Sequence, residues 1–266
     1  MNLTRSLPRK LGRKRSLRKD GFRFRDWLVI PFEDTSSEIP INWRDAAPDI
    51  WERLSAPDKI IKQDHRSLVG LIEWQGRRLV VKKFLLQRDW WWFRLTSILF
   101  PSLGEIACRN ALLLNRLGIL TPPPLLLMQR LHWGQVVDSW MIYPFVEELS
   151  TGTIELQRIV GFLKRMHRAG WIHGDSHPAN FLDTSAGLTA IDPLQARACR
   201  LRYFQALDVV HLNDDRPGSI DSYGCGELGR WIAAAQAGRR MLKFYRDAKR
   251  RLREIAGMSG NNCRQR

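Results

Sequence analysis

Cysteine is scarce in this chain of 266 residues, which has four, and no two of them form a C-x-x-C pair. This spacing excludes the common zinc-binding motifs and provides no disulfide framework, which is typical of proteins in a reducing compartment. The sequence also has no run of about 18 apolar residues, so we expect no membrane-spanning helix. Its N-terminal stretch lacks the apolar segment of a signal peptide. Together these absences indicate a cytoplasmic protein.

Acidic residues are also few: 27 Asp and Glu stand against 43 Lys and Arg, which gives a formal net charge of +16. An excess of this size predicts an anionic partner such as nucleic acid, acidic lipid or a polyphosphorylated substrate. The basic residues concentrate in residues 1–25 and 239–266. Such ends can be solvated tails, or they can hold a protein on an anionic membrane surface at about 1 kcal/mol per basic residue. We favour the membrane surface because of the motif described next.

The most informative motif lies beyond the middle of the chain, where residues 173–182 have the sequence HGDSHPANFL and Asp192 follows. An Asp, an Asn five positions later and a second Asp form the spacing that protein kinases use for phosphoryl transfer from Mg-ATP. Their motif is H-R-D-x-x-x-x-N with a metal-binding Asp downstream, and here Gly174 replaces the Arg. Turn or capping roles are the ordinary alternative for each residue singly, but the combined spacing predicts a kinase-like site.

The chemistry of phosphoryl transfer suggests a role for each motif residue. Catalysis depends on positioning and charge neutralisation. One carboxylate must orient the acceptor hydroxyl and take its proton, and Asp175 is the candidate. Hard oxygen ligands must hold Mg²⁺ against the phosphates of ATP, and Asn180 and Asp192 are the candidates. We expect strands at 181–182 and 188–191 to form a hairpin that brings Asn180 and Asp192 side by side.

Two apolar runs, 68–74 and 77–84, are separated by Gln-Gly and predict a β-hairpin. The second run ends like the V-A-I-K strand of kinases, in which a lysine reaches the phosphates of ATP. Lys82 and Lys83 are both candidates, and only one can fill the role because neighbours on a strand point to opposite faces. We prefer Lys82, since Val80 would share its face and could cover an adenine. An ordinary surface lysine is the alternative for either residue.

Two acidic residues complete the predicted nucleotide site. Residues 104–118 have helical spacing, and Glu105 near their start matches the glutamate that steadies the strand lysine in kinases. A glutamate there also suits the helix macrodipole. Glu147 follows a predicted strand at 136–143, in the position of the segment that joins two lobes, and the backbone near it would hold the adenine. No G-x-G-x-x-G motif precedes the first apolar run, so the segment that covers the phosphates is not assigned.

Two further features have alternative interpretations. Residues 90–93 are four consecutive aromatics, which form either a local hydrophobic cluster or an interfacial patch, because tryptophan favours the boundary between water and lipid. Asp208 lies in a predicted helix at 201–212 and either braces the catalytic loop or is exposed.

With these residues, the chain resembles the Kdo and heptose kinases of the lipopolysaccharide inner core, a branch of the protein-kinase-like superfamily. The resemblance is carried by V-V-K-K-F at 80–84, Glu105 with L-G-I-L-T-P at 117–122, the run at 173–182 and Ile191-Asp192. It implies transfer of the γ-phosphate of ATP, with Mg²⁺, to a hydroxyl of heptose or Kdo in lipid A-core. Such a protein would be peripheral on the inner face of the inner membrane, where its basic ends would hold it. The same motif form occurs in aminoglycoside phosphotransferases, choline kinases and atypical protein kinases.

The resemblance implies an α+β, bilobal protein-kinase-like fold with an antiparallel-sheet N-lobe and a reduced, mainly helical C-lobe. The expected division is a basic, disordered arm at 1–25, the N-lobe at 26–147 and the C-lobe at 148–266. An atypical protein or small-molecule kinase is one alternative function. A kinase-like module that binds RNA or a membrane is another. The chain keeps all five catalytic residue types of a kinase: the strand lysine, the helix glutamate, the two aspartates and the asparagine. This argues against an inactive protein. We also expect no nucleic-acid partner.

Overall fold

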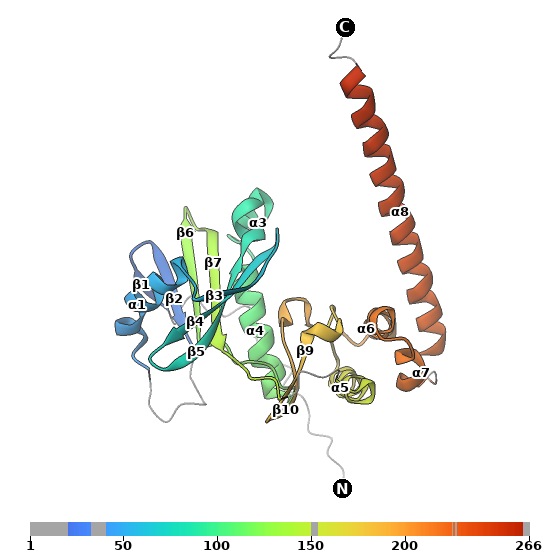
Figure 1. Ribbon diagram of the computed structural model, residues 1–266, viewed down its shortest axis with the longest axis horizontal. Helices are drawn as coiled ribbons and strands as arrows, with labels where there is room; N and C mark the ends of the chain where they lie inside the picture. The colour runs from blue at the N-terminus through green and yellow to red at the C-terminus, as the bar shows by residue number, and fades with distance from the viewer. Residues whose placement is uncertain (1–20, 33–40, 150–153, 225, 227, 263–266) are drawn as a thin grey trace. The chain divides into compact units, whose positions relative to one another are not determined.

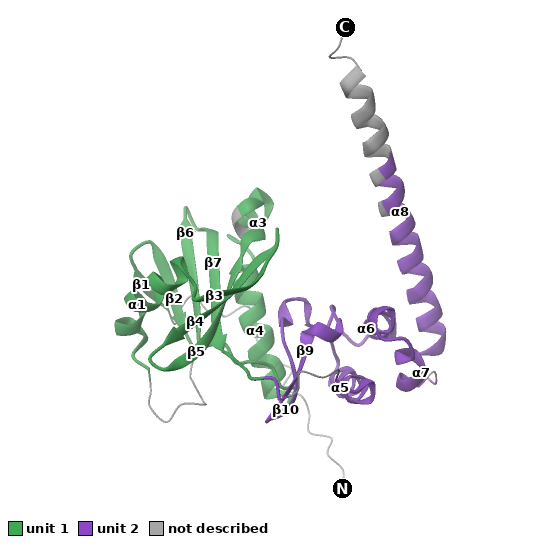
Figure 2. Cartoon of the chain, in the orientation of Figure 1, with its two compact units in different colours: residues 1–147 green, residues 148–266 purple. Residues whose placement is uncertain are grey.

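The protein has an α+β fold that divides into two compact units, residues 1–147 and 148–266 (Figure 2). Unit 1 contains a large antiparallel sheet and unit 2 consists mainly of helices (Figure 1). The computed structural model describes residues 21–32, 41–149, 154–224, 226 and 228–262.

Unit 1 is built on a seven-stranded sheet with the order β1-β2-β6-β7-β5-β4-β3. Its strands are Phe22–Phe24 (β1), Trp27–Pro31 (β2), Lys59–Gln63 (β3), Ser67–Trp74 (β4), Arg77–Phe84 (β5), Leu126–His132 (β6) and Gln135–Pro144 (β7). The turn between β4 and β5 has positive φ at both Gln75 and Gly76, as a tight hairpin connection requires. This hairpin is the one expected from the sequence.

The first strand begins inside the segment 1–25 that the sequence predicts as an arm. Phe22 and Phe24 alternate with charged residues, and both pack against the core of the sheet. Strand β1 pairs with β2 through Phe22 and Val29. Residues 1–20 of the predicted arm lie outside the described residues.

Two helices cover opposite faces of the sheet. Helix α1 (Trp43–Ser55) packs on one face, where the rings of Trp43 and Trp74 stack with centroids 6.1 Å apart. Helix α4 (Leu103–Arg116) packs on the other. A Cβ on Gly104 would lie 2.7 Å from Leu127 Cδ1, so the missing side chain lets the start of α4 approach the sheet.

Two short helices, α2 (Leu85–Asp89) and α3 (Trp91–Thr96), connect the end of β5 to α4. Both contact strand β7. The Ser97 side chain, at the end of α3, accepts a hydrogen bond from the Val136 backbone at 2.8 Å. This bond fixes the segment to the sheet.

Unit 2 contains four helices and two small antiparallel pairs of strands within the described residues. The helices are α5 (Leu156–Arg168), α6 (Arg202–Asp215), α7 (Ser219–Tyr223) and α8 (Gly229–Asn262). The strand pairs are β8 (Trp171–Ile172) with β11 (Arg197–Ala198), and β9 (Phe181–Thr184) with β10 (Gly187–Ala190). A small core joins α6 to α8 through Ala206, Val210, Leu228, Ile232 and Ala235. Across the described part of the chain, no helix combines the length and apolarity needed to cross a bilayer.

Candidate active site

The loop at 173–180 in unit 2 is fixed by one buried carboxylate on helix α6. Asp208 is 1% exposed, and its two oxygens accept hydrogen bonds from the backbone N–H groups of His173 at 2.7 Å and Gly174 at 2.8 Å. A carboxylate can be buried when hydrogen bonds compensate its lost hydration. Of the two interpretations that the sequence leaves open, the structure therefore favours the brace: Asp208 positions this loop.

Further side chains hold Asp208 in turn. His167, at the end of α5, contacts Asp208 Oδ2 through Nε2 at 3.1 Å, and its Nδ1 contacts the Tyr223 hydroxyl at 2.8 Å. The Ser176 hydroxyl donates to the Asp208 carbonyl at 2.5 Å. Sequence reasoning did not find this network, because His167 falls on the buried stripe of a helix and resembles an ordinary core residue.

Gly174 explains why the loop departs from the protein-kinase motif. Its φ is +79°, in the left-handed region, and a Cβ there would lie 2.7 Å from the carbonyl oxygen of Gln195. A side chain at this position would be strained both by its backbone conformation and by this contact. The loop therefore passes close to the segment after β10 in a way that an arginine would prevent.

The predicted catalytic residue Asp175 is half-buried and lies next to Asn180 through a backbone contact. The Asn180 side-chain amide donates to the Asp175 carbonyl at 2.8 Å, which directs the amide oxygen of Asn180 away from that carbonyl. A short 3-10 helix, Pro178–Asn180, begins with a cap in which the Ala179 backbone donates to His177 Nδ1 at 3.2 Å. The loop between Asp175 and Asn180 is therefore closed by its own hydrogen bonds.

Asp192 lies at the other end of the β9–β10 hairpin. Ala190 pairs with Phe181, and the Ile191 backbone donates to the Asn180 carbonyl at 2.8 Å. The hairpin expected from the sequence therefore forms, and Asn180 and Asp192 flank its open end. Asp192 has φ 55° and ψ 58°, a left-handed conformation that is rare outside glycine and is found where function constrains the backbone. A 3-10 turn at Pro193–Gln195 and strand β11 follow directly.

The first residue of the loop, His173, is a buried histidine. His173 is 1% exposed, and burial lowers the pKa of its imidazole. The carboxylates of Asp208, Asp175 and Asp192 act on this pKa in the opposite direction. The Asp175 backbone N–H also donates to His173 Nδ1 at 3.3 Å. Asn180 bonds to the carbonyl of Asp175 and accepts from Ile191, the neighbour of Asp192, so these bonds bring residues 175, 180 and 192 together.

Acid should destabilise the protein through His173. Its folded-state pKa lies below the ordinary value of about 6.5, so as pH falls the unfolded chain binds the proton first. The free energy of unfolding should therefore drop below pH 6.5, by up to about 1.4 kcal/mol per pH unit for this group. Urea denaturation on both sides of that pH measures the slope.

Two variants separate His173 from other titrating groups. His173→Gln should reduce the slope of unfolding free energy against pH. His132→Gln, which changes an exposed histidine in unit 1, should leave the slope as it is. Equal slopes for His173→Gln and the wild type would show that another group carries the acid sensitivity.

In unit 1, the two lysines of β5 point to opposite faces of the sheet. Lys83 lies on the face covered by α1, where its Nζ is 3.0 Å from Asp138 Oδ2 and 4.7 Å from the ring centroid of Trp140. Lys82 pairs with Met141, which pairs with Leu127, the residue beneath the start of α4. Lys83 is therefore paired with a buried carboxylate, and Lys82 shares the face of α4.

Glu105 and Glu147 have structural contacts in unit 1. Glu105 is 3% exposed and belongs to a capping box, in which its Oε2 accepts from the Ser102 backbone at 2.9 Å. Glu147 forms an exposed ion pair with Arg78. The capping contact places Glu105 at the start of α4, where its charge also suits the helix macrodipole, the alternative that the sequence offers. The partnership of Glu105 with Lys82 stays a prediction. So does adenine binding near Glu147.

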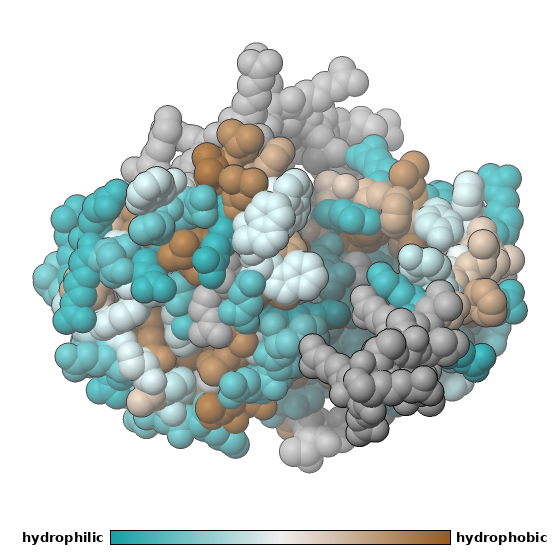
Figure 3. Space-filling view, turned by 90° about the horizontal axis from the view of Figure 1, so that it is seen from above, coloured by the Kyte–Doolittle hydropathy of each residue, from teal (hydrophilic) through white to brown (hydrophobic). Residues whose placement is uncertain are grey.

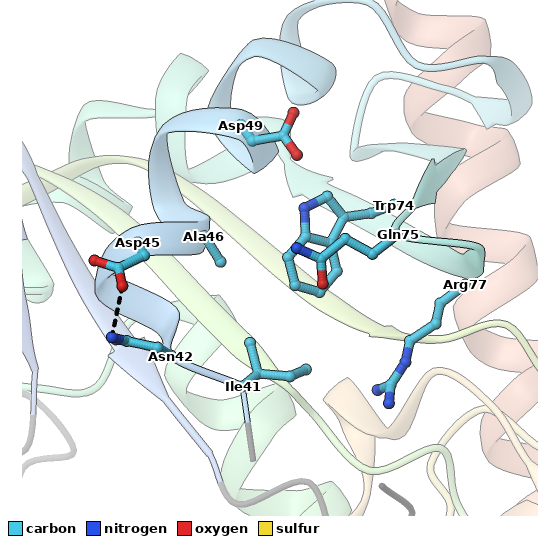
Figure 4. Close-up of a pocket in the computed structure, with 8 residues that line it drawn as sticks. All are labelled: Ile41, Asn42, Asp45, Ala46, Asp49, Trp74, Gln75 and Arg77. Atoms are coloured by element: carbon cyan, nitrogen blue, oxygen red, sulfur yellow. Dashed lines mark hydrogen bonds between the residues drawn. The ribbon is translucent and has the colours of Figure 1, made fainter. Parts of the chain in front are cut away.

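One pocket of unit 1 lies away from all of these residues. It is bounded by the start of α1 and the β4–β5 turn, and Asn42 donates to Asp45 Oδ2 at 2.7 Å on its wall (Figure 4). Its lining residues are Ile41, Asn42, Asp45, Ala46, Asp49, Trp74, Gln75 and Arg77. The two aspartates make it a poor site for triphosphate, and it contains none of the predicted nucleotide-binding residues.

Comparisons with known proteins do not assign an activity to this chain. No protein-family model and no curated protein matches the sequence. Among solved structures, the chain is similar to WaaP in a complex with acyl carrier protein, at 20% sequence identity and a TM-score of 0.44, covering 76% of this chain and 92% of that chain. Chains this different can share an arrangement of elements without sharing a reaction.

Proposed function

We propose that this protein is a Mg-ATP-dependent kinase that phosphorylates a sugar hydroxyl, of heptose or Kdo, in the lipopolysaccharide inner core. The observation that supports phosphoryl transfer best is the linkage of the three motif residues through Asn180, whose side chain bonds to the Asp175 carbonyl and whose own carbonyl accepts from the residue before Asp192. The sugar acceptor and its location on lipid A-core are supported by the motif resemblance and by the net charge of +16.

The donor set is compatible with Mg²⁺. An aspartate and an asparagine are oxygen ligands, and Mg²⁺ is usually held by one or two carboxylates together with substrate phosphates and water. The described residues contain no cluster of three or more His, Cys, Asp or Glu that could hold a metal alone. Asn180 and Asp192 are the residues that would hold the ion together with ATP, and its charge would offset that of the phosphates.

Each residue then has a defined task. Asp175 orients the acceptor hydroxyl and accepts its proton, while Asn180 and Asp192 would supply oxygen ligands to Mg²⁺. Asp208 keeps the loop in place through the His173 and Gly174 backbones. Lys82, in unit 1, is the residue that would bind phosphate oxygens through its ammonium.

Lys82 and Lys83 provide a matched pair of variants for this proposal. Lys82→Ala should lower kcat/KM for ATP about 100-fold, because a preorganised cation is lost. Lys83→Ala should leave the activity of the folded protein close to wild type but reduce the unfolding free energy by about 3 kcal/mol, because Asp138 stays buried without its cation. Steady-state kinetics and urea denaturation distinguish the two effects. The reverse pattern would assign phosphate binding to Lys83.

The acceptor is tested by transfer of label from γ-labelled ATP. Purified protein, Mg²⁺ and lipid A-core should yield labelled core oligosaccharide, and fragmentation by mass spectrometry should locate one new phosphate on heptose or Kdo. Label on protein or on a small molecule instead would favour the alternative kinases and reject the sugar acceptor. RNA binding that weakens steeply with salt, without ATP turnover, would reject the kinase itself.

A further inference from the structure

An unusual apolar surface covers one end of unit 1 around helix α3. Its members, called here the tryptophan surface, are large hydrophobic side chains between 44% and 74% exposed: Trp90, Trp91, Trp92, Leu95, Ile98, Leu99 and Phe100. Apolar and tryptophan side chains, brown and pale, gather over this part of unit 1 when it is seen from above (Figure 3). Exposed apolar patches of this kind usually mark a binding surface.

Helix α3 and the turns after it present their apolar side chains on the side that faces away from the sheet. Positions 91, 92, 95, 98 and 99 have the spacing of one helical face, and that face points outward. Ser97 is 2% exposed and is bonded to Val136 on β7. A polar residue thus faces the sheet and apolar residues face outward, which is the reverse of a solvated helix on a globular protein.

Hydrogen bonds hold this segment in a defined position against the sheet. The Phe100 backbone donates to Thr96 at 2.8 Å and the Ile98 backbone donates to Leu95 at 3.2 Å, so the turns continue beyond α3. Together with the Ser97 bond, these contacts hold the apolar side chains outward in a fixed geometry. Of the two interpretations of residues 90–93 that the sequence leaves open, their exposure favours the interfacial patch.

We infer that the tryptophan surface inserts into the interfacial region of an anionic lipid bilayer. Three of its seven members are tryptophans, the side chain best suited to the boundary between water and hydrocarbon. The sequence from Trp90 to Phe100 has no Asp or Glu, and the chain carries a net charge of +16. A cationic protein is attracted to anionic lipid. Burial of the apolar tryptophan surface in the bilayer interface adds to the affinity of this binding.

This inference extends the sequence expectation, which assigned adhesion to the basic ends and left residues 90–93 open between a local cluster and an interfacial patch. It is also independent of the proposed reaction, because vesicle binding requires neither ATP nor a sugar acceptor. A kinase of another substrate could use the same surface. Failure of the sugar-kinase proposal would therefore leave this inference standing, and the reverse is equally true.

The test is cosedimentation of the full chain with vesicles of phosphatidylcholine, with and without phosphatidylglycerol. The variant Trp91→Ser with Leu99→Ser and Phe100→Ser changes three side chains that are at least 55% exposed. We expect the affinity of this variant for anionic vesicles to be at least about 30-fold lower than that of the wild type, because each serine loses the free energy that burial of the original apolar side chain would give. A matched control, Leu149→Ser with Leu201→Ser, changes two equally exposed apolar residues of unit 2 and should bind like wild type.

Three readouts make the result decisive. Circular dichroism and thermal unfolding should show that both variants fold, because the altered side chains are exposed. If the tryptophan-surface variant binds vesicles as tightly as wild type, the inference is overturned and the basic ends carry adhesion. If the wild type self-associates and the variant is monomeric with unchanged vesicle binding, the surface joins two copies of the chain, which also overturns it.

Discussion

Asp175→Ala should lower kcat for phosphoryl transfer by about 1,000-fold, in the range found when a general base is removed. The change removes only the carboxylate. Asn180 bonds to the backbone carbonyl of residue 175, and the Asp208 contacts involve His173 and Gly174, so the loop should stay in place. ATP affinity, measured by calorimetry or nucleotide fluorescence, should therefore be close to wild type while turnover is lost.

Asp183→Asn is the matched control for this experiment. Asp183 lies on β9 in the same hairpin and forms a surface ion pair with Arg158, which holds the pKa of its carboxyl below the ordinary value. Such pairs contribute little, so activity should stay within about twofold of wild type. Full turnover by Asp175→Ala would remove Asp175 from the catalytic role and with it the central assignment of the motif.

The second large effect is expected at Asp208, which positions the loop. Asp208→Asn keeps the size of the side chain but replaces one acceptor oxygen with an NH₂ group. One of the backbone N–H groups of His173 and Gly174 would then face a donor instead of an acceptor. We expect the free energy of unfolding to fall by about 3 kcal/mol, since a buried charged hydrogen bond is lost and a buried donor is left unsatisfied.

Kinetics distinguish a positioning role from a merely structural one. At a temperature where Asp208→Asn is folded, kcat should fall more than KM for ATP changes, because the displaced loop carries Asp175. Asp214→Asn, six residues further along α6, removes an exposed ion pair with Arg239 and should change stability by less than about 0.5 kcal/mol. Wild-type stability and kcat in Asp208→Asn would contradict the brace.

The sequence predicts those elements well in which local chemistry and burial agree. The strand at 77–84 has the bounds predicted for it, and the Gln75-Gly76 turn has the positive φ angles that its hairpin needs. The hairpin after Asn180 also forms, because Gly187 permits the turn between two short apolar runs. The spacing of the motif residues contains enough local information to suggest the site.

Other features depend on partners distant in sequence. Strand β3 is exposed along its length and has no apolar alternation, so only its pairing with β4 identifies it. The choice between Lys82 and Lys83 is supported by Asp138, some 55 positions later, which engages Lys83. Likewise, the role of Asp208 becomes visible only when helix α6 packs beneath the loop at 173–180.

The short path from Asp192 to β11 has a consequence for control of the proposed kinase. Residues 193–196 alone separate this aspartate from a strand that pairs with β8. Protein kinases that are activated by phosphorylation have a long activation loop after the metal-binding aspartate, and this loop becomes ordered when it is phosphorylated. With only a short 3-10 turn at this point, we expect a kinase that is always active and whose output follows the supply of its acceptor.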